Sequence, residues 1–221
     1  MILLKVLRSV ILLDLKGGAL ASTIQQYTYG GTSSLYKFLS RILQEVCAPL
    51  INMIKLWMIH GEAHDLYGDF FVTADPNVPD EMLWFSKYSL NTEQIPTFLT
   101  YDLANKVFLT GKAINFIRKC CAETEWTVSS LLHEPEIKNW AEIMENPGIL
   151  GEWIIKVHEA TNAQLINLLF AKYKLLDHCE SIRKYLLLAQ GDMHQYLMDL
   201  IYDTLSKPAE QIYKYCSISL Y

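Results

Sequence analysis

The sequence has little positive charge in any one place. Charged residues make up 19% of its 221 residues, the formal net charge is −5, and no basic cluster is longer than two residues. Proteins that bind nucleic acid through its phosphates need a basic patch or stripe. We therefore expect no nucleic-acid partner.

The chain also lacks the cysteine spacing of a disulfide framework or a zinc site. Its cysteines are odd in number and none forms a CxxC pair; they are Cys47, Cys120, Cys121, Cys179 and Cys216. Thiols without such a pattern are typical of a reducing compartment. The sequence favours the cytoplasm and predicts no structural metal.

An uninterrupted membrane-spanning run is missing from the N-terminus. The apolar stretch MILLKVLRSVILLDLK is broken by Lys5, Arg8 and Asp14, and no small-residue cleavage motif follows it. A membrane span needs about 20 predominantly apolar residues. We expect a buried amphipathic helix here rather than a signal peptide or an anchor, and no membrane span.

Apolar and aromatic side chains are abundant. Hydrophobic residues make up 51% of the chain, which has 13 Tyr and 5 Trp. This excess predicts several buried helices, or surfaces that a partner covers. Aromatic side chains suit both cores and interfaces.

Most of the chain has apolar residues at helical spacing. The clearest stripe runs from Leu35 to Met58 and contains Pro49, so we expect that helix to kink or split near Val46. Gly61 is expected to end the segment.

Three further segments have a helical pattern: Ala19–Tyr27, Leu99–Cys121 and Glu152–Leu188. The last is about 37 residues long without proline or glycine, which predicts one long helix. Residues 62–97 are irregular, with a two-strand element expected at Phe70–Thr73 and Trp84–Ser89. Residues 122–150 are expected to form a polar loop with a short helix. The sequence thus predicts an all-α fold of extended, stacked helical bundles with a small β-like insertion near 62–97.

Some stretches of the sequence are similar to a metal-binding or catalytic motif, but each lacks an essential part of it. His60 and His64 have the i, i+4 spacing of metal ligands, but Gly61 should break the helix between them. The glutamates from Glu123 to Glu145 are scattered, and Cys120-Cys121 has no local histidine motif. We expect no enzyme, no cofactor and no metal site.

Thr110-Gly111-Lys112 is similar to the end of a phosphate-binding loop, but the upstream glycine is absent. Gly111 is therefore expected at a helix bend or a close approach of two helices. Lys112 is expected in solvent.

A helix–corner–helix joint is expected within Ser181–Leu200, at Gln190-Gly191-Asp192. Gly191 can adopt the positive φ that ends the first helix, and Asp192 can cap the second.

Four ordered blocks of sequence resemble the gamma-tubulin complex protein family. They are KGGALASTIQQYTYGG at 16–31, PLINMIKLWMIHGEAHDLYGDFFV at 49–72, LWFSKYSL at 83–90 with IPTFLTYDLANKVFLTGKAINFIRKCC at 95–121, and KYKLLDHCESIRKYLLLAQGDMHQYLMDLI at 172–201. The family typically has a Trp-containing helix, Gly-Glu and Phe-Phe in the second block, and Thr-Gly-Lys-x-x-Asn in the third. The residues that match the motifs of the last three blocks are Trp57, Gly61, Glu62, Phe70, Phe71, Gly111, Lys112, Asn115, Gln190, Gly191 and Asp192.

The resemblance implies a non-enzymatic scaffold that supports microtubule nucleation at microtubule-organising centres and spindle poles. Its partners would be other gamma-tubulin complex components, packed laterally, and gamma-tubulin, bound mainly by the C-terminal domain. The motif residues would be structural anchors. The alternative is an unrelated helical adaptor, for which a repeat of roughly 30–45 residues would be expected.

The resemblance also implies a domain division. Residues 1–174 would be the later part of an N-terminal grip domain, and residues 175–221 the start of a C-terminal, gamma-tubulin-binding one. Since members of the family are several hundred residues long, we expect this chain to be a fragment.

Overall fold

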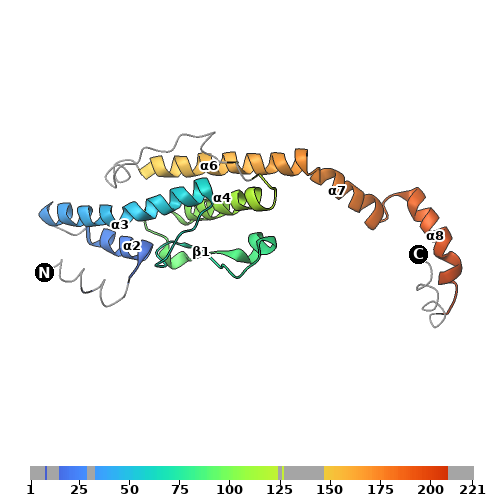
Figure 1. The fold of residues 1–221 in the computed structure, drawn as a ribbon, viewed down its shortest axis with the longest axis horizontal. Coiled ribbons are helices and arrows are strands. Elements are labelled where there is room, and N and C mark those ends of the chain that lie inside the picture. The colour runs from blue at the N-terminus through green and yellow to red at the C-terminus, as the bar shows by residue number, and fades with distance from the viewer. Residues whose placement is uncertain (1–7, 9–14, 29–32, 124–125, 127–146, 209–221) are drawn as a thin grey trace. The chain divides into compact units, whose positions relative to one another are not determined.

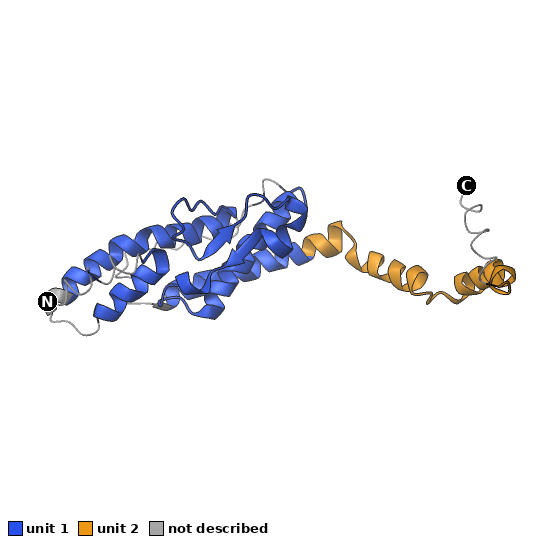
Figure 2. Ribbon diagram, turned by 90° about the horizontal axis from the view of Figure 1, so that it is seen from below, with its two compact units in different colours: residues 1–166 blue, residues 167–221 orange. Residues whose placement is uncertain are grey.

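A computed structural model describes residue 8 and residues 15–28, 33–123, 126 and 147–208. The chain divides into two compact units, residues 1–166 and 167–221 (Figure 2). The helix expected at the N-terminus and most of the loop expected at 122–150 lie outside the described residues, although residues 147–150 already belong to a helix.

The described part of the chain is mainly helical, with one small two-stranded sheet, which confirms the predicted fold class. The first unit contains α2 (Gly17–Thr28), α3 (Ser33–His60), α4 (Tyr101–Lys119) and nearly all of α6 (Pro147–Asn167). The second unit contains the π-helical turn η5 (Leu168–Lys172), α7 (Leu175–Ser181), the π-helical turn η6 (Ile182–Leu186) and α8 (Gly191–Leu205).

Helices α3 and α4 lie side by side and run in the same direction (Figure 1). Trp57 of α3 contacts Val107 of α4, and Gly61, which follows α3, contacts Asn115 further along α4. Neighbouring helices that run the same way need a crossover connection that returns along their length. Residues 61–100 are that connection, which explains why an insertion lies here.

Helix α6 packs along α4, again in the same direction (Figure 1). Leu103 lies close to Gly151 near the start of both helices, and Thr110 contacts His158 further along both. Leu150, Trp153, Ile154 and Val157 enter the same core as α3 and α4.

Helix α2 packs against α3, and its first two glycines let it approach the insertion closely. A Cβ on Gly17 would lie 1.8 Å from the carbonyl oxygen of Asp69, and one on Gly18 would lie 1.8 Å from that of Gln94. Gly17 also has a φ of +49°, which favours glycine. Helix α2 therefore begins at the Gly17-Gly18 pair, in close contact with the backbone of the insertion.

The insertion contains the sheet and three short turns. Strand β1 (Val72–Ala74) pairs antiparallel with β2 (Tyr88–Leu90), with Val72 opposite Leu90. The turns are η1 (Asp80–Met82), η2 (Leu83–Lys87) and η3 (Thr92–Gln94).

The predicted second strand is only partly right, because η2 is a π-helical turn and the strand begins at Tyr88. The turn places Leu83 in the core while the Trp84 ring lies 6.0 Å from that of Phe116 in α4. Contact with α4 thus overrides the strand preference of the aromatic sequence.

Pro49 does not split α3, which stays one helix from Ser33 to His60. A proline removes the hydrogen bond to the carbonyl four residues earlier, that of Glu45. Glu45 and Pro49 are both exposed, so water can reach this side of the helix. Of the kink or split expected near Val46, the split is wrong, because the lost hydrogen bond lies on the solvent side of the helix.

The long helix expected at Glu152–Leu188 is also wrong. Lys174 adopts a left-handed conformation with φ +48° and begins α7, and Leu188 has φ +53° before α8. A left-handed residue other than glycine costs about 1–2 kcal/mol. Because neither position is a glycine or a proline, composition gives no signal for these breaks.

Residues Tyr36–His60 of α3 are long and apolar enough to cross a membrane, and 44% of that segment is buried inside the structure. This is weak evidence for a span, because a buried core helix passes the same test. Leu39, Leu43, Ile54 and Trp57 are among its fully buried residues.

The contact between α2 and the insertion can be tested with Gly18→Ala. Because the new methyl group would overlap the Gln94 carbonyl, we expect a loss of about 2–3 kcal/mol in the free energy of unfolding, measured by urea denaturation. Gly148→Ala is the matched control, since no atom lies within 4 Å of its added Cβ, and it should be neutral or stabilising by up to about 1 kcal/mol. Equal effects of the two substitutions would contradict the close approach.

Candidate functional site

Four motif residues meet where Trp57 of α3 lies against the backbone of α4. These residues are Trp57, Gly61, Gly111 and Asn115, and together they are called the Trp57 cluster. The Trp57 indole is fully buried, and its Nε1 donates a hydrogen bond of 3.0 Å to the carbonyl oxygen of Val107. A Cβ on Gly111 would lie only 2.0 Å from Cε2 of the indole. Gly111 therefore marks a close approach of two helices, one of the two roles expected for it.

Asn115 joins the end of α3 to α4. Its Nδ2 donates to the carbonyl oxygens of Gly61 at 2.7 Å and Gly111 at 3.0 Å. Gly61 has φ +65° and its N–H donates to the Trp57 carbonyl at 3.0 Å, so it ends α3. A Cβ on Gly61 would overlap the Asn115 amide at 2.6 Å.

Two neighbours of these residues, Tyr88 and Arg118, support the same cluster. The Tyr88 ring packs edge-on against Trp57 with centroids 4.9 Å apart, which ties the sheet to α3. Arg118 donates through Nη1 to the His60 carbonyl at 2.6 Å and through Nε to the Trp126 carbonyl at 3.2 Å. Arginine is common on helix surfaces, so no local signal in the sequence identifies Arg118.

Lys112 is buried, and the expectation that it lies in solvent is wrong. Its side chain is 8% exposed, with Nζ 5.1 Å from the centroid of the Trp84 ring and 4.9 Å from that of Phe108. Burial lowers the pKa of this amine below its ordinary value. Cation–π contacts offset part of the cost of desolvation, so Lys112 holds η2 on α4.

Phe70 and Phe71 are both 1% exposed, and their ring centroids are 4.6 Å apart. The preceding loop is fixed by the carboxylate of Asp65. Its Oδ1 accepts from the N–H of Asp69 at 3.0 Å, and its Oδ2 accepts from that of Phe70 at 2.8 Å. The phenylalanines thus enter the core from a loop whose own backbone is held in place.

Glu62 is exposed and its carboxylate lies 3.4 Å from Nε2 of His64, which is also exposed. A pair of this kind contributes little to stability. Among the described residues, no group of three or more His, Cys, Asp or Glu side chains could hold a metal ion. Neither His60 nor His64 lies in such a group.

Asp80 ties the insertion to α4 through an ion pair with Lys119 at 3.0 Å, and it forms a second ion pair with Lys87 inside the insertion. Hydrogen bonds from both lysines, Lys87 first, lower the pKa of this exposed carboxyl.

His158 bridges α4 and α6. Its Nδ1 lies 2.9 Å from Oγ1 of Thr110 and its Nε2 lies 3.0 Å from Nδ2 of Asn162. Burial, and then the positive charge of Lys106, lower the pKa of the imidazole, while Glu159 acts in the opposite direction. The folded chain therefore favours neutral His158.

Gln190, Gly191 and Asp192 form a joint, as expected, but with different roles. Gln190 caps α8 with no side-chain hydrogen bond, and Gly191 is not among the residues with positive φ. The carboxylate of Asp192 accepts from the N–H of Met193 at 2.9 Å, inside the first turn. Leu188, with φ +53°, makes the turn expected of Gly191.

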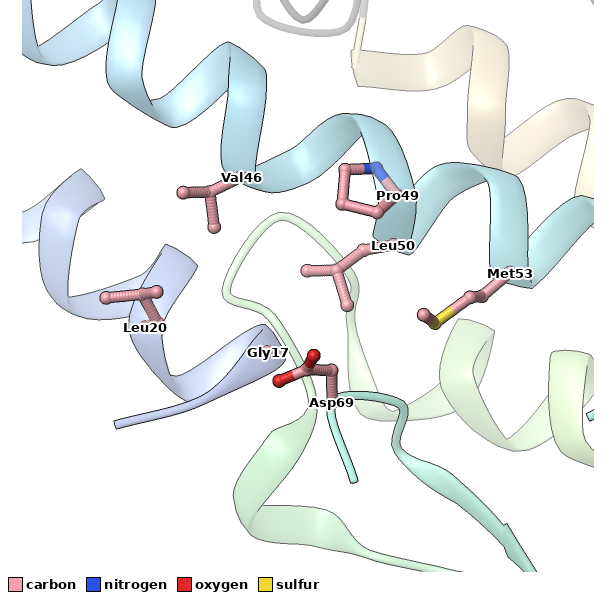
Figure 3. A pocket seen from close by; sticks show the side chains of 7 residues that line it. All are labelled: Gly17, Leu20, Val46, Pro49, Leu50, Met53 and Asp69. Carbon is pink, nitrogen blue, oxygen red and sulfur yellow. The ribbon is translucent and has the colours of Figure 1, made fainter. Parts of the chain in front are cut away.

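An apolar notch of about 200 Å³ lies between α2, α3 and the loop before Phe70 (Figure 3). Its lining residues are Gly17, Leu20, Val46, Pro49, Leu50, Met53 and Asp69. No sequence pattern groups these residues, because they come from three segments.

The residues of the Trp57 cluster are buried and hydrogen-bonded to one another, so they position backbone rather than bind a substrate. Glu62 directly follows Gly61, but its exposed side chain contacts His64 and takes no part in the cluster. The corner at 190–192 belongs to the second unit. The arrangement can hold helices at a fixed spacing.

Comparison with known proteins places both parts of the chain in one family. Residues 1–172 match the family described as Gamma tubulin complex component N-terminal, and residues 175–218 match Gamma tubulin complex component C-terminal.

Individual relatives cover most of this chain. It is 35% identical over 204 residues to Gamma-tubulin complex component 3 of Arabidopsis thaliana, covering 90% of the chain and 24% of that protein. It is 36% identical over 208 residues to the component 3 homolog of Xenopus laevis, covering 90% and 22%. It is 27% identical over 248 residues to Spindle pole body component 98 of Dictyostelium discoideum, covering 93% and 30%. The chain spans between a fifth and a third of the length of these relatives.

Asn115→Ala tests the hydrogen bonds of the Trp57 cluster. Because the buried carbonyl of Gly61 would lose the donor at 2.7 Å, we expect a loss of about 2–3 kcal/mol in the free energy of unfolding. Asn105→Ala, on a partly exposed position of the same helix, should change it by no more than about 0.5 kcal/mol. A small effect of Asn115→Ala would show that the two carbonyls do not depend on this amide.

The lowered pKa of His158 predicts a pH dependence of stability. The ordinary pKa is 6.5 and the folded value lies below it, so the unfolded chain takes up this proton first. Stability from His158 is therefore full above about pH 6.5 and is lost as the pH falls toward the folded pKa. Urea denaturation should show that the free energy of unfolding of the wild type is smaller at pH 5.5 than at pH 7.5. The difference between the two pH values should be smaller in His158→Gln. The exposed His64→Gln should keep the wild-type dependence, and an unchanged dependence in His158→Gln contradicts the assignment.

Proposed function

This chain belongs to the gamma-tubulin complex component family, and on that basis we propose that it is a non-enzymatic scaffold that supports microtubule nucleation. The observation that carries the proposal is the match of the N-terminal and C-terminal family descriptions, in order, to residues 1–172 and 175–218. Relatives named gamma-tubulin complex component 3 cover 90% of the chain.

The geometry of the first unit supports a scaffold role. Three helices that run in the same direction are held together by buried contacts: the Trp57 cluster between α3 and α4, and the Thr110–His158 contact between α4 and α6. Helices fixed in this way can set the spacing between partners at their surfaces. Buried, satisfied polar groups of this kind specify one arrangement.

We propose the division of the chain at residue 174. Residues 1–174 would be the later part of the N-terminal domain, and residues 175–221 the beginning of the gamma-tubulin-binding one. The left-handed Lys174, immediately before α7, supports this position.

We propose two classes of partner. Other gamma-tubulin complex components would pack laterally against the first unit, and gamma-tubulin would bind through the C-terminal part. The second unit suits further contacts, since α7, η6 and α8 have no buried residue. A relative named as a spindle pole body component supports localisation at microtubule-organising centres.

The alternative of an unrelated helical adaptor is overturned by the family matches. An enzymatic role also lacks support, since the motif residues of the Trp57 cluster are engaged with backbone and with each other.

Co-purification tests the proposed function. The tagged chain, expressed with gamma-tubulin complex component 2 and gamma-tubulin of the same organism, should recover component 2 and, if the C-terminal part suffices, gamma-tubulin. Gly111→Val, which pushes α4 away from Trp57, should lose component 2, whereas Gly148→Ala should retain it. Recovery of neither partner by the wild-type chain would contradict the proposal.

A further inference from the structure

The notch between α2 and α3 is open at the surface, and its lining is apolar except for Asp69. Leu20, Val46 and Met53 are partly exposed, and Leu50 is buried behind them. Figure 3 shows the Asp69 side chain at one edge, opposite the side chains of α3. The notch is therefore an apolar depression with one carboxylate at its rim.

The rim is fixed before any partner arrives. The Asp69 N–H donates to Oδ1 of Asp65 at 3.0 Å, and its carbonyl oxygen lies where a Cβ on Gly17 would be. The backbone of Asp69 is thus held by the Asp65 carboxylate on one side and lies against Gly17 on the other. A preformed site avoids part of the ordering cost of binding.

The size of the notch favours a side chain over a small molecule. Ligand pockets usually measure about 300–1,000 Å³. The notch holds about 200 Å³, which suits one or two apolar side chains. Buried anchors of this kind dominate the energy of protein–protein interfaces.

The charge at the rim selects the neighbour of that anchor. Asp69 forms no ion pair with another described residue, and it is partly exposed. A lysine or arginine beside an apolar anchor would meet this carboxylate. The same loop exposes Leu66 by 92% and Tyr67 by 76%, which gives a partner further apolar contact.

We propose that the notch, with Asp69 at its rim, is a docking site for a neighbouring gamma-tubulin complex component. That component inserts an apolar side chain between Leu20, Val46 and Met53 and places a basic side chain against Asp69. The proposal rests on the proposed function and assigns a face to the lateral contact.

The test measures the affinity of the full chain for purified gamma-tubulin complex component 2. Asp69→Lys reverses the rim charge and Val46→Trp fills the notch, and each should weaken binding about tenfold or more. Glu81→Lys is the matched control, since it makes the same charge change at an exposed position of η1, and it should bind as the wild type does. Circular dichroism melting curves of all three variants should follow the wild type.

Four outcomes separate the two proposals. Weaker binding by both notch variants and not by the control supports the docking site. Wild-type affinity in a folded Asp69→Lys or Val46→Trp variant overturns the docking site and leaves the proposed function in place. If the wild-type chain binds neither component 2 nor gamma-tubulin, both fail. If Asp69→Lys abolishes only self-association of the chain in sedimentation, the occupant is a second copy and the proposal is wrong.

Discussion

The structure of the first unit depends on the close approach of α3 and α4 at Gly111. The Trp57 indole can lie on the backbone of α4 only because residue 111 has no side chain there. This closeness brings Nε1 within 3.0 Å of the Val107 carbonyl. It also lets the Asn115 amide reach the last turn of α3 at Gly61. Without it, the polar groups of the cluster would be buried and unpaired, which is costly.

The same contact explains why the chain carries its insertion. Since α3 and α4 run in the same direction, residues 61–100 must return along them, and this connection forms the small sheet. The connection is in turn fixed to both helices, through Tyr88 of the sheet against Trp57 and through Trp84 of η2 against Lys112. A crossover of this kind adds contacts to the helices it connects. A scaffold that holds partners at a fixed spacing needs such rigidity.

Helical periodicity predicts most of the fold, because a 3.6-residue repeat of apolar side chains can be recognised in the sequence without knowing which segments pack together. The end of α3 at Gly61 and the role of Gly111 follow from the special geometry of glycine. Tertiary contacts decide the rest. Lys112 lies over the Trp84 ring of another segment and the Phe108 ring of its own helix, and the left-handed Lys174 has no signal in its residue type. Family motifs identify Trp57, but only the fold shows that it meets Asn115 and Gly111 in one cluster.

The measurement that tests this account most directly is a double-mutant cycle of Gly111→Ala and Trp57→Ala, followed by urea unfolding. In the wild-type background, Gly111→Ala should cost about 3 kcal/mol, because its methyl group overlaps the indole. In the Trp57→Ala background it should be neutral or stabilising by up to about 1 kcal/mol, since the obstacle is gone and alanine favours a helix. Equal costs of Gly111→Ala in both backgrounds would contradict the claim that this contact holds α3 against α4.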